Sequence, residues 1–252
     1  FDTTRKAAIF RTEYSKWFPI QFQILDGTMR TTSKNRITNP STSLLLLLPL
    51  LGMGLFVFFY VIAALRYPGG SWVEPDQEGF SFWYNYLCDL LDQNAINGEL
   101  NTARFHARAA LGFLCISVIL LWSYLPRLFS NKSLNLKLMW FTGIASLITI
   151  MLLASDTHDS TVRIAGFLGG VALISCFVEL FKARYYKLFT FGMVCFIVFL
   201  INYYCYETGL FLHSLPMIQK ITFVLFLVWF VLLDISMYHK LKSKKKTSLE
   251  TL

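Results

Sequence analysis

Long apolar runs that hold few or no charged residues alternate with polar segments through most of the chain. A helix that crosses a bilayer core needs about 20 mostly apolar residues. The runs therefore predict six transmembrane helices, over residues 44–65, 105–125, 138–154, 164–181, 188–206 and 216–238. The predicted fold class is all-α, a polytopic transmembrane helix bundle.

The charged residues between these runs alternate in sign. Four segments are basic: residues 29–43 and the segments after the second, fourth and sixth runs. They contain Lys and Arg but no acidic residue before Glu250. The other three connections hold nine of the twelve Asp and Glu outside the N-terminal segment, together with His158 and His213, and His106 lies at the outer start of the second run. The positive-inside rule then predicts that both termini are cytoplasmic, which requires an even number of spans and agrees with six.

Composition supports a lipid environment. Hydrophobic residues make up 55% of the chain and charged residues only 15%, whereas soluble domains have about 25% charged residues. The net charge of +8 does not indicate nucleic-acid binding, because the basic residues flank apolar runs and form no single patch. We expect the basic C-terminal segment to contact anionic lipid, and we expect the protein in the plasma (inner) membrane.

Three regions follow from this pattern: an N-terminal tail over residues 1–42, a membrane domain over 43–239 and a basic cytoplasmic tail over 240–252. The chain begins with Phe1 and its first methionine is Met29. We therefore expect residues 1–28 to lie outside the native protein.

The first extracytoplasmic loop contains an aromatic stretch over residues 80–91. With 12 residues it is too short to span a bilayer, so it predicts a short interfacial helix. Asp89 and Asp92 would lie one turn apart on that helix and share a face. Cys88 in this loop and Cys205 near the end of the fifth run are candidates for a disulfide.

The turn between the third and fourth runs is rich in reactive side chains. Asp156, His158 and Asp159 lie within four residues, and a carboxylate beside an imidazole can orient it or raise its basicity. In a catalytic interpretation His158 is the base or a metal ligand, Asp156 and Asp159 are its partners, and Asp89 comes from the loop. In the alternative, these polar residues cap the fourth helix.

Histidines on three segments are predicted at the same end of the bundle. Imidazole and carboxylate ligands suit zinc, so the candidate ligands are His158, His106, His213 and Asp156. No H-x-x-x-H or H-E-x-x-H spacing supports them, and each histidine alone is typical of a membrane interface. Further candidates for substrate binding at this end are Asn85, Asp92, Arg108, Arg163, Asn202 and Glu207.

Two acidic residues fall inside the apolar runs. Glu179 is expected to pair with Lys182, three residues on, and Asp234 is expected to extend toward the nearby interface. Gly166, Gly169 and Gly170 predict close helix packing along the fourth span.

Residues 80–91, F-S-F-W-Y-N-Y-L-C-D-L-L, resemble a motif of a prokaryotic membrane protein family, domain of unknown function nine-hundred-ninety-eight. In that motif an aromatic run precedes N-F-L-S-D-L-G, which Asn85, Leu87, Asp89 and Leu90 match. Cys88 replaces the Ser and Leu91 replaces the Gly. The resemblance implies a six-helix layout, similar to the Frag/DRAM/Sfk group, with His158 and Asp159 opening the fourth span. It implies no established activity.

Two classes of function remain open. In the first, the protein is a non-enzymatic membrane protein that binds, senses or assembles with a lipid, small molecule or partner through a polar extracytoplasmic vestibule. In the second, it is a metal- or His-dependent hydrolase that acts on a lipid or lipid-linked substrate. The spans are apolar at their centres, which disfavours a transporter of charged solutes.

Overall fold

The fold was obtained as a computed structural model that describes residues 47–129, 133–151 and 158–250, with only the backbone described for residues 158–159 and 244–250. These residues contain no β-strand, only two isolated β-bridges. The helices are α3 (Leu48–Leu65), η1 (Cys88–Leu91), α4 (Arg104–Tyr124), η2 (Leu125–Leu128), α5 (Leu134–Ile150), α6 (His158–Lys182), α7 (Tyr186–Thr208) and α8 (Leu215–Glu250).

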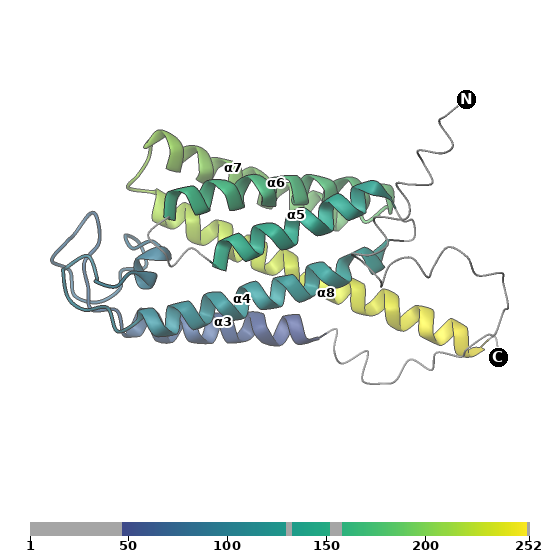
Figure 1. The fold of residues 1–252 in the computed structure, drawn as a ribbon, viewed down its shortest axis with the longest axis horizontal. Helices are drawn as coiled ribbons and strands as arrows, with labels where there is room; N and C mark the ends of the chain where they lie inside the picture. Colours follow the sequence, from purple (N-terminus) through teal and green to yellow (C-terminus); the bar gives the residue numbers. More distant parts are fainter. Residues whose placement is uncertain (1–46, 130–132, 152–157, 251–252) are drawn as a thin grey trace, which may run out of the picture. The chain divides into compact units, whose positions relative to one another are not determined.

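The long helices run back and forth as three neighbouring pairs, α3 with α4, α5 with α6 and α7 with α8 (Figure 1). The core contains side chains from all six, with Trp122, Met139, Phe177 and Trp229 among its large members. The connection between α3 and α4 and the turn between α7 and α8 lie at one end of this bundle, here called the loop end. The start of α5 and the basic part of α8 lie at the other end, the tail end.

Five of these helices are long and apolar enough to cross a membrane, and α5, with 17 residues, is a shorter apolar helix. Many large apolar side chains on the helices are exposed, for example Phe58, Phe141, Phe167 and Val224. A water-soluble bundle would bury such side chains. The structure therefore indicates a multi-pass membrane protein, as the apolar runs predicted.

The helix bounds agree with the predicted spans to within about four residues, with two larger differences. Helix α6 begins at His158, earlier than predicted, and has 25 residues. Helix α8 continues through the basic segment to Glu250, because Lys is a good helix former and no Pro or Gly follows the apolar part. Residues 44–46 and 152–154 of the predicted spans lie outside the described residues.

The predicted interfacial helix over residues 80–91 is wrong in extent, since only the 3-10 helix η1 (Cys88–Leu91) forms there. Side chains take the backbone donors that a helix would use. Asn85 Oδ1 accepts from Ser81 N at 2.8 Å, and Asp89 Oδ2 accepts from Tyr86 N at 2.8 Å. Asn and Asp compete with helices in this way. Asp89 is buried and Asp92 is exposed, so the two do not share a face.

Helices approach closely where glycine meets an indole. Trp122 on α4 donates from Nε1 to Met139 O on α5 at 2.9 Å, and a Cβ built on Gly143 would lie 2.0 Å from that nitrogen. Gly169 similarly faces Ser146, whereas a Cβ on Gly170 would meet nothing within 4 Å. Close helix packing was predicted at the glycines of α6. Gly169 makes such a close contact, and Gly170 does not.

We expect Gly143→Ala to lower the free energy of unfolding by about 1–3 kcal/mol, because the added methyl overpacks a buried indole that is held by its own hydrogen bond. Denaturant titration in detergent micelles measures this change. Gly170→Ala is the matched control and should be neutral or slightly stabilising, because Ala favours helix more than Gly does. Equal effects of the two substitutions would contradict the proposed contact.

Candidate binding site at the loop end

The connection between α3 and α4, residues 66–103, folds back on itself through backbone hydrogen bonds. Gly70 N donates to Gln77 O at 2.8 Å, and Gly79 N donates to Pro68 O at 3.1 Å. Gly70 has φ +83°, and a Cβ there would lie 2.4 Å from Asn97 N. Glycine is therefore required at this crossing of two chain segments.

Asn85 is the centre of this loop and is fully buried. Its Nδ2 donates to Gly70 O at 2.7 Å and to Asp89 Oδ2 at 2.9 Å. Its Oδ1 accepts from Gln77 Nε2 at 2.9 Å as well as from Ser81 N. One amide thus joins both arms of the loop, which identifies Asn85 as a structural residue.

Asn101 performs the same task at the end of the loop, where it is also fully buried. Its Nδ2 donates to the carbonyls of Leu90 and Asp92 at 3.2 and 3.0 Å, and its Oδ1 accepts from Ala103 N. Arg108 on α4 adds two hydrogen bonds to Leu91 O. These contacts fix η1 against the start of α4.

Burial raises the pKa of Asp89 to about 6, against its ordinary value near 3.8. The hydrogen bonds from Asn85 and Tyr86 N and the charge of Lys220 oppose this shift, whereas the nearby Asp92 adds to it. The folded protein therefore binds this proton more tightly than the unfolded chain does. The contribution of protonated Asp89 to the free energy of unfolding is therefore present at acidic pH and is lost as the pH rises from about 4 to about 6.

We expect Asp89→Asn to raise the free energy of unfolding at pH 7.5 by about 1–3 kcal/mol, since each pKa unit corresponds to about 1.4 kcal/mol. The amide oxygen can accept both hydrogen bonds that Asp89 Oδ2 accepts. Unfolding measured from pH 4 to 7 should show a flatter profile in this variant. Asp89→Ala, which loses the acceptor, should be destabilised at every pH, and an unchanged pH profile in Asp89→Asn would contradict the assignment.

The loop is attached to α8 and to the turn before it by contacts across long sequence separations. Lys220 Nζ, on a 5% exposed residue, donates to Asn85 O and to Pro216 O and lies 5.3 Å from the centroid of the Phe82 ring. Gln219 Oε1 accepts from Leu87 N at 2.9 Å. Tyr86 Oη donates to Leu212 O at 3.4 Å. These contacts hold residues 80–87 against the start of α8.

A groove lies between the attached loop and the α7–α8 turn. Its volume is about 380 Å³, and its lining is mostly aromatic or apolar: Trp72, Val73, Tyr84, Tyr86, Leu212, His213 and Pro216. The Tyr84 and His213 rings meet edge to face, with centroids 5.5 Å apart. Tyr86, Leu212 and Pro216 of this lining also take part in the contacts that attach the loop. We call this feature the aromatic groove.

The predicted metal and catalytic residues are only partly described. His213 lines the aromatic groove, whereas His106 on α4 lies 3.4 Å from Arg66 Nη1 and stacks on Phe59. A guanidinium against an imidazole disfavours a bound cation there. No group of three or more His, Cys, Asp or Glu among residues with described side chains is arranged to hold a metal ion. Asp156 and the side chains of His158 and Asp159 lie outside the described part, so those predictions stay predictions.

Two of the predicted substrate-binding residues contact each other, and the others have separate partners or positions. Arg163 at the start of α6 forms an ion pair with Glu207 at the end of α7, with Nε and Oε1 2.9 Å apart. Asn85 and Arg108 hold the loop, Asp92 is exposed after η1, and Asn202 is half-buried on α7. The five cysteines are free thiols, so the candidate disulfide between Cys88 and Cys205 is not formed.

The sequence reasoning missed Lys220 and the groove residues Trp72 and Val73. Lys220 had a detectable signal, because a charged residue inside an apolar run needs a partner. Trp72 and Val73 had none, since they meet the α7–α8 turn only through long-range folding of the loop.

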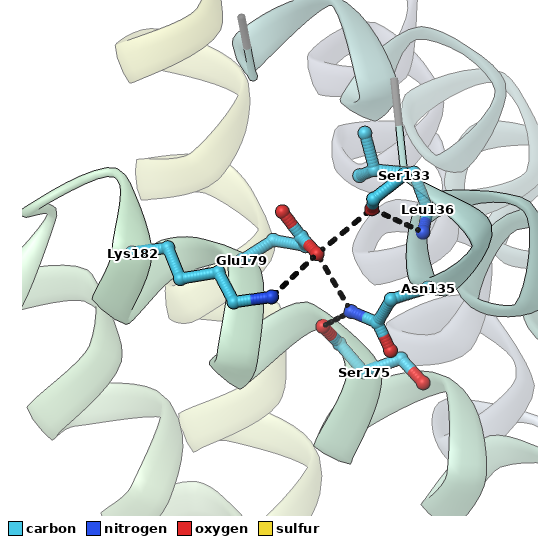
Figure 2. A network of polar contacts seen from close by, with 6 residues as sticks. All are labelled: Ser133, Asn135, Leu136, Ser175, Glu179 and Lys182. Atoms are coloured by element: carbon cyan, nitrogen blue, oxygen red, sulfur yellow. Dashed lines mark hydrogen bonds and ion pairs between the residues drawn. The ribbon is translucent and has the colours of Figure 1, made fainter. Parts of the chain in front are cut away.

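A second polar cluster lies at the tail end and joins α5 to α6 (Figure 2). Glu179 Oε1 accepts from Ser133 Oγ at 3.0 Å and from Asn135 Nδ2 at 2.9 Å, and lies 3.6 Å from Lys182 Nζ. The expected pairing of Glu179 with Lys182 is confirmed. Ser133 also caps α5 by accepting a hydrogen bond from Leu136 N. The cluster therefore holds the start of α5 against α6 and has a structural role.

Comparisons with protein-family models, curated proteins and solved structures found no match to the chain. The resemblance carried by residues 80–91 therefore stays a prediction, and the geometry of the loop end is the basis for the function.

Proposed function

We propose that the protein is a non-enzymatic membrane protein that binds a lipid-like amphiphile in the aromatic groove. The observation that carries this proposal is the groove itself, an apolar and aromatic hollow of about 380 Å³. Binding sites for small molecules have this size and this lining, with a few polar groups that set orientation.

The surroundings of the groove support an occupant that comes from a membrane. Several large apolar side chains beside it are exposed: Phe82, Trp83, Leu210 and Phe211. Aromatic side chains of this kind favour the boundary between headgroups and acyl chains. The groove also lies where the apolar part of α8 begins, at Leu215. An amphiphile at that depth would present its headgroup to the groove.

The acidic and amide side chains of the loop support binding rather than hydrolysis. Three of these side chains, Asn85, Asp89 and Asn101, are buried and form hydrogen bonds within the loop. A hydrolase would need such groups within reach of the substrate. We further propose that both termini are cytoplasmic, that the protein lies in the plasma membrane, and that the basic end of α8 contacts anionic lipid.

The test uses the full chain in nanodiscs that contain a phospholipid with a photoactivatable group near its headgroup. Mapping the crosslinks by peptide mass spectrometry should place them in residues 72–86 and 210–216. Tyr84→Ala should reduce them about tenfold, because truncating an aromatic anchor commonly costs more than 1 kcal/mol. Phe191→Ala, in a shallow hollow on α7, is the matched control. Crosslinks spread evenly over the helices, and unaffected by Tyr84→Ala, would sink the proposal.

A further inference from the structure

The composition of the aromatic groove indicates the chemistry of its occupant. The lining includes the rings of Trp72, Tyr84, Tyr86 and His213, and it includes no carboxylate, amide or lysine side chain. Aromatic faces carry negative potential and attract cations, and clusters of them are used to recognise quaternary ammonium groups. The lining therefore suits a cation that needs no hydrogen-bond acceptors.

Charge around the groove favours the same occupant. Glu74 and Asp76 follow the Trp72–Val73 wall directly and are exposed. The loop over residues 66–103 carries six acidic residues and one basic residue, Arg66. Such a surplus of one sign raises the local concentration of the opposite charge. A positive headgroup would be drawn to this wall.

The opposite wall has positive charge behind it. Pro216 lines this wall, and its carbonyl accepts from Lys220 Nζ at 3.2 Å. Lys220 is too buried to touch a ligand, but its charge lies next to this side of the groove. His213 is an exposed hydrogen-bonding group at the same wall. The groove is thus polarised, negative at the loop and positive at α8.

We infer that the aromatic groove binds a zwitterionic lipid headgroup that carries a quaternary ammonium, with the ammonium at Trp72 and the tyrosines and the phosphate toward His213. This inference rests on the proposed function and adds the headgroup class to it. A primary ammonium fits less well, because its three N–H donors would find few acceptors in the lining. The lipid is the source, because the exposed Phe82, Trp83 and Phe211 place the groove at the membrane boundary.

The experiment measures retention of a photoactivatable phosphatidylcholine by the full chain in nanodiscs, with competition by unlabelled phosphatidylcholine, phosphatidylethanolamine or phosphatidylglycerol. We expect phosphatidylcholine to compete best. Trp72→Leu keeps apolar bulk but removes the aromatic face, and it should weaken retention roughly 3- to 30-fold, the range between an exposed and a desolvated cation–π contact. Trp72→Phe should retain most of the binding.

The remaining outcomes separate this inference from the proposed function. Equal competition by all three lipids, with Trp72→Leu as effective as wild type, would overturn the headgroup assignment and leave amphiphile binding intact. Best competition by phosphatidylglycerol would overturn it in favour of an anionic ligand. Soluble phosphocholine is added as a further competitor. If it displaced the probe as strongly as phosphatidylcholine does, the assignment of the occupant as a membrane lipid would be overturned. Absence of specific crosslinks would overturn both proposals.

Discussion

Glu179→Ala is expected to lower the free energy of unfolding by about 3–5 kcal/mol. The Glu179 side chain is only 6% exposed, and its Oε1 accepts hydrogen bonds from two neutral donors, Ser133 Oγ and Asn135 Nδ2. Hydrogen bonds to a charged group contribute about 1.5–3 kcal/mol each, and their loss leaves buried donors without acceptors. Denaturant titration in detergent micelles measures the change.

Two further variants show which contact carries the effect. Lys182→Ala should change the free energy of unfolding by less than about 1 kcal/mol, because the Lys182 side chain is 61% exposed and such ion pairs are screened by water. Glu179→Gln keeps an acceptor oxygen and should lose only part of the stability. If Lys182→Ala lowers the free energy of unfolding as much as Glu179→Ala does, the ion pair within α6, rather than the hydrogen bonds from Ser133 and Asn135, carries the effect.

The transmembrane helices were predictable because their signal is local. A charge-free apolar run of this length is stable in lipid as a helix, because a helix satisfies all its backbone hydrogen bonds internally. Thus α7 (Tyr186–Thr208) agrees with the predicted span to within a few residues. The pairing of Glu179 with Lys182 was also local, at three residues apart.

The loop end was not predictable in the same way, because its contacts join distant residues. Leu87 N meets Gln219, and Asn85 O meets Lys220, across more than 130 residues. The aromatic composition and short length of residues 80–91 predicted an interfacial helix, but the side chains of Asn85 and Asp89 accept hydrogen bonds from the backbone N–H groups of Ser81 and Tyr86. The same aspartate that looked like a catalytic group therefore has a structural position.

The prediction of one shared histidine centre stays a prediction, because Asp156 and the side chain of His158 lie outside the described residues. His106 and His213 were placed at one end of the bundle from the order of spans. The structure gives them different neighbours, Arg66 and Phe59 for His106 and Tyr84 for His213. Sharing an end of a bundle constrains depth in the membrane but not position around the bundle axis.

Asp234 was expected to extend to the interface, and the structure corrects this, since the residue is fully buried. Neither carboxylate oxygen has a hydrogen-bond partner among the described residues. The neighbouring Leu233 and Met237 are fully buried too, so this side of α8 faces the core. One turn earlier Phe230 contacts Trp122 on α4. The carboxyl group therefore carries an uncompensated desolvation cost.

We expect Asp234→Leu to raise the free energy of unfolding by about 2–4 kcal/mol, because it removes two buried polar atoms without partners and fills the same space with apolar atoms. Asp234→Asn keeps polar atoms at the site and should gain much less. Ser236→Leu adds apolar bulk at a less buried position of the same helix and controls for a general effect of hydrophobicity. A loss of stability in Asp234→Leu would show that the carboxyl has a partner. A gain in stability accompanied by loss of lipid binding would show that Asp234 is kept for function, since intramembrane carboxyl groups of this kind are commonly functional.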